Sequence, residues 1–199
     1  VMEQMQIIFA SSNGESFCLD NLKIAEVIEE APEEAPDRNI TENILWTDEY
    51  NNYNPNFETV GGWWGDTSWG QTGLSYKDYA DHKPSEDCLN KYVEVSKVGD
   101  KASVQIGHSS LSTVMKSGQE YEYSYYVKLA DGVESGDVAL TIKGMAANYW
   151  PECVATITKD QQVTLSSTEW TKVTGTFVVD DVMEQMQIIF ASSNGESFC

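Results

Sequence analysis

The chain has 199 residues and a formal net charge of −20, from 32 acidic and 12 basic residues. Because phosphate groups are bound by basic surfaces, this negative charge argues against nucleic acids and anionic membranes as partners. The length suits one domain with extensions, and no stretch is long and apolar enough to cross a bilayer.

The N-terminal segment is a duplicate. Residues 1–18, VMEQMQIIFASSNGESFC, recur unchanged as residues 182–199, and the first copy alone continues into LDNLKI. We therefore interpret residues 1–26 as the C-terminal strands of a module, a duplicate of 182–199 plus the closing strand. Residues 27–41 are acidic and contain proline, which predicts a linker. The body of the molecule is then residues 42–199.

In the body of the molecule, short runs of alternating apolar and polar residues are separated by Gly, Ser, Asn and Asp. This pattern predicts antiparallel strands. The runs are residues 92–96, 102–107, 121–129, 137–144, 153–159, 170–179 and 184–191. A two-sheet antiparallel β-sandwich is the simplest all-β architecture for such a chain. Within 121–129 the alternation places Tyr121, Tyr123, Tyr125, Val127 and Leu129 inward, and Glu122, Ser124, Tyr126 and Lys128 outward. In the duplicated strand, Met186, Ile188 and Phe190 are predicted to point inward.

Two identical strands compete for one place in such a sandwich. The first copy can fold back onto its own body, or the second copy can keep its place while only residues 19–24 pair. Alternatively, the first copy completes a neighbouring molecule, which would be a strand-swapped self-association. The sequence leaves the three arrangements open.

Four cysteines are present, of which Cys18 and Cys199 are copies of one position. No C-x-x-C pair and no paired His/Cys spacing occurs, which disfavours a zinc site. A Cys88–Cys153 disulfide and buried free thiols both remain open.

Four motifs in a fixed order resemble one known family. They are NPNFE (54–58) followed by GGWW (61–64), KSGQEYEYSYYVKL (116–129), STEWTKVTGTFVV (167–179) and SFCLDNLKI (16–24). This order is similar to that of the family 4, 9 and 22 group of carbohydrate-binding modules, with the closing strand supplied by the N-terminal copy. The resemblance implies a jelly-roll sandwich that binds β-linked plant cell-wall polysaccharide, xylan first and β-glucan next. It also implies a non-catalytic role beside a glycoside hydrolase such as a xylanase, at an extracellular or cell-surface location.

Aromatic side chains are the candidate sugar-binding groups, since a pyranose ring stacks its C–H face on Trp or Tyr. Adjacent strand residues face opposite ways, so Trp63 and Trp64 cannot both lie in the core. The family pattern makes Trp63 the structural one. The candidates for carbohydrate binding are Trp64, Trp69, Tyr126, Tyr149 and Trp150, with Glu122 as a partner for sugar hydroxyls. Alternatively, each of these side chains simply packs against the rest of the protein or lies on a face exposed to solvent.

The resemblance also implies a structural Ca²⁺ between the two chain ends, held by oxygen ligands. The matching positions are Glu58, Asp20 and Asn56. Because Asp20 occurs only after the first copy, a complete site requires residues 19–24 to reach the body.

Two other functions compete with the binding module. A glycoside hydrolase would need a pair of positioned carboxylates, but the acidic residues follow the linker, turns and outward faces. We therefore expect no catalysis by this chain. A structural spacer or adhesion domain without a glycan site is the second alternative, and it predicts no polysaccharide binding at all.

Overall fold

The computed structural model describes residues 4–10, 17–28, 39–40, 45, 54–60, 63–65, 72–80, 82–98, 102–107, 115–145, 153–159, 163–179 and 185–192. For part of the strands it describes the backbone alone. The strands are β1 (Gln4–Ala10), β2 (Phe17–Ile28), β3 (Asn39–Ile40), β4 (Trp64–Gly65), β5 (Leu74–Asp78), β6 (Lys91–Val95), β7 (Ala102–Gly107), β8 (Glu120–Leu129), β9 (Asp137–Met145), β10 (Cys153–Lys159), β11 (Val163–Thr164), β12 (Thr171–Val178) and β13 (Gln185–Ser192). Nowhere in these ranges is there a helix that could span a membrane.

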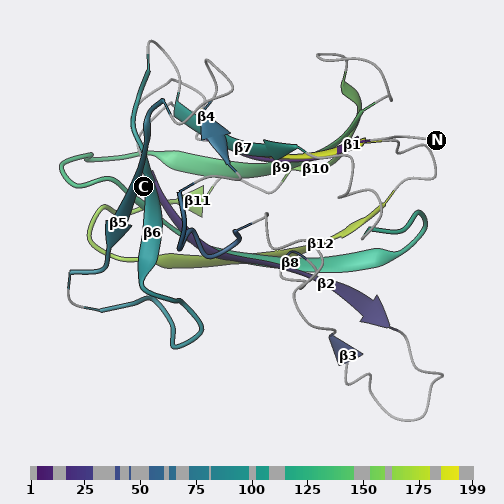
Figure 1. Cartoon of the computed structure of the whole chain (residues 1–199), viewed down its shortest axis with the longest axis horizontal. Coiled ribbons are helices and arrows are strands. Elements are labelled where there is room, and N and C mark those ends of the chain that lie inside the picture. Colours follow the sequence, from purple (N-terminus) through teal and green to yellow (C-terminus); the bar gives the residue numbers. More distant parts are fainter. Residues whose placement is uncertain are drawn as a thin grey trace.

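The strands form two sheets, which lie one above the other in Figure 1. The larger sheet runs β10-β9-β1-β13-β7-β4, with β11 beside β9, and the smaller runs β12-β8-β2-β6-β5, with β3 beside β2. Pairings between the described strands are antiparallel, except that β1 and β13 run parallel. The all-β fold predicted from the alternating pattern is confirmed.

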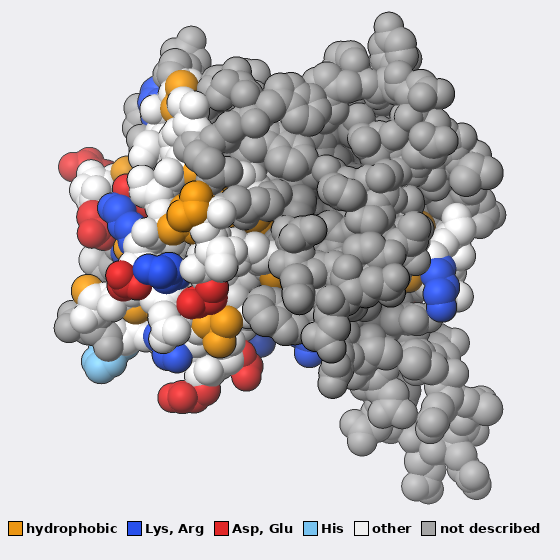
Figure 2. Space-filling model, viewed as in Figure 1, with side chains coloured by type: hydrophobic (Ala, Val, Ile, Leu, Met, Phe, Trp, Pro, Cys, Tyr) orange, Lys and Arg blue, Asp and Glu red, His pale blue; other side chains and the backbone are white. Residues whose placement is uncertain are grey.

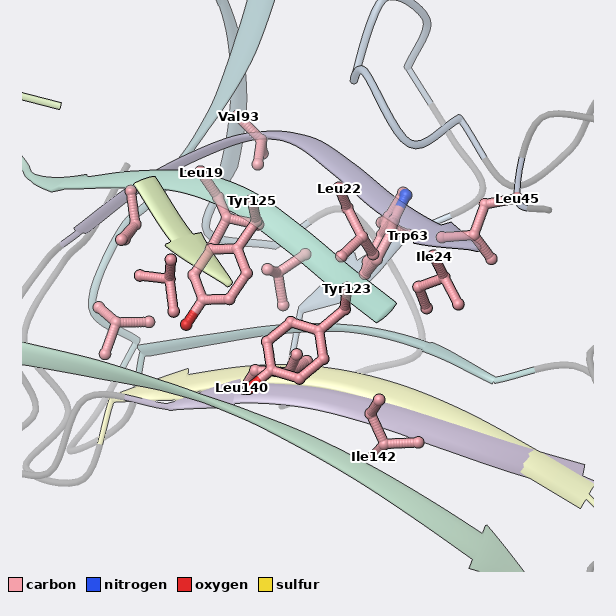
Figure 3. Packing of buried hydrophobic residues seen from close by; sticks show 14 of the residues in the cluster. Leu19, Leu22, Ile24, Leu45, Trp63, Val93, Tyr123, Tyr125, Leu140 and Ile142 are labelled. Carbon is pink, nitrogen blue, oxygen red and sulfur yellow. The ribbon is translucent and has the colours of Figure 1, made fainter. Parts of the chain in front are cut away.

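Side chains from both sheets meet in one core. Along β8 the residues alternate between buried and half-buried, as the sequence predicted, and the buried set is the inward one. Figure 3 shows Tyr123 and Tyr125 of β8 on the side of the sheet that faces Leu140 and Ile142 of β9. This shared core establishes that the two sheets pack face to face.

The closing strand comes from the N-terminus of the same chain. β2 lies between β8 and β6, and its register with β8 shifts between Asp20 and Lys23, where Asn21 adopts a φ of 49°. This bulge lets both Leu22 and Ile24 reach the core, where Leu19 is also fully buried. Residues 19–24 therefore dock onto the body in cis, as one of the predicted arrangements requires.

The two duplicated strands are neighbours in the larger sheet. β1 and β13 pair with each other in parallel without any shift, Gln4 opposite Gln185. Both also pair with β9, where Gly144 lies opposite Met5 and opposite Met186. The backbone register of β13 places position 190 opposite the core residue Leu140, while the side chains of the predicted inward set lie outside what the structure describes.

Charged side chains protect the open edge of the smaller sheet. Lys77 of β5 pairs with Glu94 of β6 at 2.5 Å, and Lys91 of β6 pairs with Asp78 of β5 at 2.6 Å. Lysines and carboxylates are interspersed on this side of the molecule in Figure 2. Such exposed pairs add little stability, but charge on an edge strand discourages pairing with other chains.

Gly175 makes room for a core tyrosine. It lies opposite Tyr123 on β12, and a Cβ at this position would come within 2.7 Å of Tyr123 Cε1 and closer still to the hydroxyl. Tyr123 is held by Tyr125 and Phe177, so its ring has little room to move. We expect Gly175→Ala to lower the free energy of unfolding by about 1–3 kcal/mol, measured by urea denaturation. Thr174→Ala, one residue away on the exposed face, is the matched control, and equal effects of the two changes would refute this packing argument.

Candidate functional site

The outward face of the larger sheet carries a row of buried polar side chains. On β7 the side chains of Ala102 and Val104 belong to the core. Because side chains alternate along a strand, Ser103 and Gln105 lie on the outward face. On β9 the same alternation places Thr141 outward. These three polar side chains are only 5–7% exposed.

The Ser103 hydroxyl is buried without a hydrogen-bond partner among the described residues. Among the side chains that the structure describes, Ser103 Oγ is one of three buried polar groups that have no hydrogen-bond partner. A buried hydroxyl without a partner costs free energy, and such groups are scarce in native proteins.

Trp63 is the structural tryptophan, as the sequence predicted. Trp63 is 1% exposed, donates its indole N–H to the Asn54 carbonyl at 3.2 Å, and packs against Phe57 with ring centroids 5.2 Å apart. It is a core residue. Position 64 lies opposite Gln105 in the β4–β7 register, and opposite residues of an antiparallel pair share a face.

Three further candidates cannot be placed in the structure. Trp69, Tyr149 and Trp150 lie outside the described residues. By chain order, Trp69 follows β4, and the other two lie in the connection between β9 and β10. Since β4 and β10 are the two outermost strands of the larger sheet, these connections begin at its opposite edges.

Tyr126 and Glu122 lie on a different face. Both are half-buried residues on the outward side of β8, in the smaller sheet, and Lys172 Nζ lies 5.8 Å from the centroid of the Tyr126 ring. The sandwich stands between this face and the outward face of the larger sheet. The structure therefore does not bring Tyr126 and Glu122 together with position 64 into one site.

An aromatic cluster that the sequence did not predict covers part of the smaller sheet. Tyr79, Tyr92 and Trp170 lie with their ring centroids 5.1–5.7 Å apart, and Lys128 Nζ lies 5.7 Å from the Trp170 centroid. The structural role expected for Trp170 agrees with this packing. Tyr92 and Trp170 pack on Cys18, which is buried and disulfide-bonded.

Cys88 is a buried free thiol, so the alternative of a Cys88–Cys153 disulfide is wrong.

The loop NPNFE is folded so that it meets the bulge in β2. Asn54 closes the loop by donating to the Thr59 carbonyl at 2.5 Å, and the backbone N–H of Leu22 donates to the Pro55 carbonyl at 3.2 Å. Asn54 and Phe57 both have positive φ, at 42° and 53°. Such strained residues often occur where a loop must present particular groups.

Two of the predicted calcium ligands have unpaired oxygens. Asp20 Oδ1 and Asn56 Oδ1 are buried and, within the described residues, lack hydrogen-bond partners. Glu58 lies close enough to Asp20 to raise its pKa, and accepts hydrogen bonds from the backbone N–H groups of Asn90 and Lys91, the latter at 2.7 Å. The described ranges contain no group of three or more His, Cys, Asp or Glu side chains that could hold a metal ion, and the set proposed here has two carboxylates and one amide. Buried carboxylate and amide oxygens are what Ca²⁺ prefers, so these residues fit the ion.

Burial raises the pKa of Asp20 from 3.8 to about 6, against hydrogen bonds from Tyr79 and Cys88 that lower it. Burial and the nearby Asp20 carboxylate raise the pKa of Cys88 to about 12. An ionised Asp20 is therefore disfavoured in the folded protein unless a cation compensates it.

The raised pKa predicts a pH-dependent loss of stability without calcium. Between pH 3.8 and about 6 the folded state holds a proton on Asp20 that the unfolded state has lost, so stability falls as the pH rises. In EDTA we expect a loss of at most about 3 kcal/mol over this range, which Asp20→Asn should abolish. Urea denaturation at successive pH values measures the difference between the two proteins, and equal slopes would contradict the assignment.

The comparisons with known proteins agree on one class. The model of the family CBM_4_9, described as a carbohydrate binding domain, matches residues 51–196. The structure of the CBM22-1 xylan-binding domain from Paenibacillus barcinonensis Xyn10C superimposes with a TM-score of 0.50 and 18% sequence identity, covering 71% of this chain and 83% of that one. At this identity the likeness shows a shared fold. No curated protein sequence matches the chain significantly.

Proposed function

This chain belongs to the carbohydrate binding domain family CBM_4_9, and from that premise we propose that it binds β-linked plant cell-wall polysaccharide, with xylan favoured and β-glucan next. The family match over residues 51–196 is the observation that carries the class of ligand. The xylan-binding description of the structural neighbour supports placing xylan first.

We place the glycan on the outward face of the larger sheet. Ser103, Gln105 and Thr141 are polar residues of this face, each only 5–7% exposed, and they lie beneath the place that we propose for the sugar. Register puts position 64 beside Gln105, so an aromatic residue stands next to the polar row. Stacking and hydrogen bonding are thereby available from neighbouring positions, which is what a pyranose ring requires.

The proposed role is targeting rather than catalysis. Such a module would hold an attached glycoside hydrolase, such as a xylanase, on its insoluble substrate at an extracellular or cell-surface location. Linkage raises the effective concentration of the enzyme at the polysaccharide without any new catalytic group. The alternative is a spacer or adhesion domain without a glycan site.

We propose that Ca²⁺ binds between Asp20, Asn56 and Glu58 as a structural ion. The two unpaired oxygens of Asp20 and Asn56 support this, as does the raised pKa of Asp20. The ion would fasten the N-terminal closing strand β2 to the loop 54–59. It would contribute to stability and have no part in the sugar contacts.

Affinity electrophoresis tests the proposed function. The protein is run in native gels that contain xylan, mixed-linkage β-glucan or no polysaccharide. Retardation in the xylan gel is expected, with affinity in the micromolar range of roughly −8 kcal/mol typical of several shallow contacts. Unretarded migration in both polysaccharide gels would favour the spacer or adhesion alternative.

A further inference from the structure

The two oxygens of the Asp20 carboxylate have different surroundings. Asp20 is fully buried, and its Oδ2 accepts a hydrogen bond from the Tyr79 hydroxyl. The Cys88 thiol, a weaker donor, also acts on this carboxylate. Within the described residues, Asp20 Oδ1 has no hydrogen-bond partner, and neither has Asn56 Oδ1. One oxygen of Asp20 is therefore engaged by the protein, while the other is buried and unpartnered.

A cation would relieve two unfavourable features of this arrangement. A buried carboxylate oxygen without a partner costs free energy, and such groups are scarce in native proteins. The Glu58 carboxylate lies close enough to Asp20 to disfavour a second negative charge there. A cation held between the two carboxylates would remove the repulsion and supply the missing partner of Oδ1.

Tyr79 begins a segment that orients both carboxylates. This segment connects β5 to β6, and its ends are joined by the backbone N–H of Tyr79, which donates to the Asn90 carbonyl at 3.3 Å. At one end the Tyr79 hydroxyl donates to Asp20. At the other end the backbone N–H groups of Asn90 and Lys91 donate to Glu58 Oε1, the latter at 2.7 Å. One connection thus arranges two of the three proposed calcium ligands.

The aromatic cluster fixes the Tyr79 ring relative to β2. The ring centroid of Tyr79 lies 5.1 Å from that of Tyr92 and 5.7 Å from that of Trp170. Tyr92 and Trp170 in turn pack on Cys18, two residues before Asp20 in the same strand. Since a tyrosine has only two side-chain torsions, a held ring leaves its hydroxyl in one place. The cluster therefore keeps the Tyr79 hydroxyl at Asp20.

We propose that Tyr79 is a positioning residue of the calcium site, whose hydroxyl engages Asp20 Oδ2 and leaves Oδ1 for the ion. This inference rests on the proposed calcium site at Asp20, Asn56 and Glu58. Metal ligands are commonly oriented by hydrogen bonds from residues that do not touch the ion. The aromatic cluster then has a role of its own, separate from the glycan site proposed on the larger sheet.

Calcium titration of Tyr79→Phe tests this role. The full chain is freed of metal with EDTA, and its affinity for Ca²⁺ is measured by isothermal titration calorimetry. Loss of a group that orients a ligand should weaken binding by about tenfold or more. Tyr92→Phe is the matched control, because it removes one hydroxyl from the same aromatic cluster while the donor to Asp20 remains. This variant should bind Ca²⁺ as tightly as the unmodified chain.

A second measurement separates positioning from a general loss of stability. The free energy of unfolding of each protein is measured in urea, once in EDTA and once in excess Ca²⁺. A purely structural effect of Tyr79→Phe lowers both values equally and cancels in their difference. Tenfold weaker binding instead reduces this calcium-dependent gain by about 1.4 kcal/mol. An unchanged gain, or an unchanged affinity, would overturn the positioning role.

Asp20→Asn distinguishes failure of this inference from failure of the calcium site itself. If the unmodified chain binds no Ca²⁺, or if Asp20→Asn binds it equally well, the proposed site and the role of Tyr79 are both wrong. If Asp20→Asn weakens binding and Tyr79→Phe does not, the site stands and only the role of Tyr79 is overturned. We expect both variants to bind more weakly than the unmodified chain.

Discussion

A chain that lacks residues 1–28 is expected to lose cooperative unfolding. This truncation removes β2, which lies between β8 and β6 and buries Leu19, Leu22 and Ile24 completely. Burying each such side chain contributes about 1.5–3 kcal/mol, so the three together approach the whole stability of a typical domain. The second copy ends at Cys199 and contains no equivalent of these residues, so it cannot replace them.

A truncation after residue 16 is the matched control for this result. It removes β1 but keeps β2, and β13 keeps its pairing with β9. Thermal unfolding followed by circular dichroism should show a sharp transition for this shorter truncation and none for the longer one. A sharp transition at the original temperature after removal of residues 1–28 would show that β2 is dispensable.

The second large effect concerns two adjacent tryptophans. Trp63→Ala is expected to lower the free energy of unfolding by about 3–5 kcal/mol. The change leaves a cavity in the core and removes the indole N–H that donates to the Asn54 carbonyl. Trp64→Ala should leave the stability nearly unchanged and weaken glycan binding roughly fivefold, as expected for the loss of one stacked ring.

Urea denaturation and affinity electrophoresis of the two variants separate the roles. The register supports this division, because Trp63 belongs to the core and position 64 shares a face with Gln105. If Trp64→Ala destabilised the fold as strongly as Trp63→Ala, position 64 would be part of the packing and the proposed stacking role would be lost.

The fold is largely predictable from the sequence because alternation has a direct physical cause. Side chains in a strand must alternate between faces, so the pattern alone indicates the buried set of β8 and the inward set of β13. The closing strand is predictable for a different reason. The motif SFCLDNLKI (16–24) resembles the closing strand of a known family, and the resemblance implies that residues 19–24 pair with the body.

The site is less predictable, because alternation within a strand does not say which sheet the strand joins. The sequence groups Tyr126 and position 64 as one set of candidates, yet β8 lies in the smaller sheet and β4 in the larger. The polar row of Ser103, Gln105 and Thr141 escapes prediction, since each residue reads as an ordinary outward position in its own strand. The aromatic cluster around Trp170 likewise depends on contacts between distant segments.

The central claim is that the outward face of the larger sheet binds the glycan, and a comparison of two variants tests it most directly. Gln105→Ala and Tyr126→Ala alter opposite faces of the sandwich, and each is titrated with the polysaccharide that retards the unmodified chain, after circular dichroism confirms that it is folded. The account predicts a loss of affinity of about tenfold for Gln105→Ala, near the 1–2 kcal/mol expected of a buried hydrogen-bonding group, and no change for Tyr126→Ala. Unchanged affinity for Gln105→Ala together with a loss for Tyr126→Ala would contradict it and would move the site to the smaller sheet.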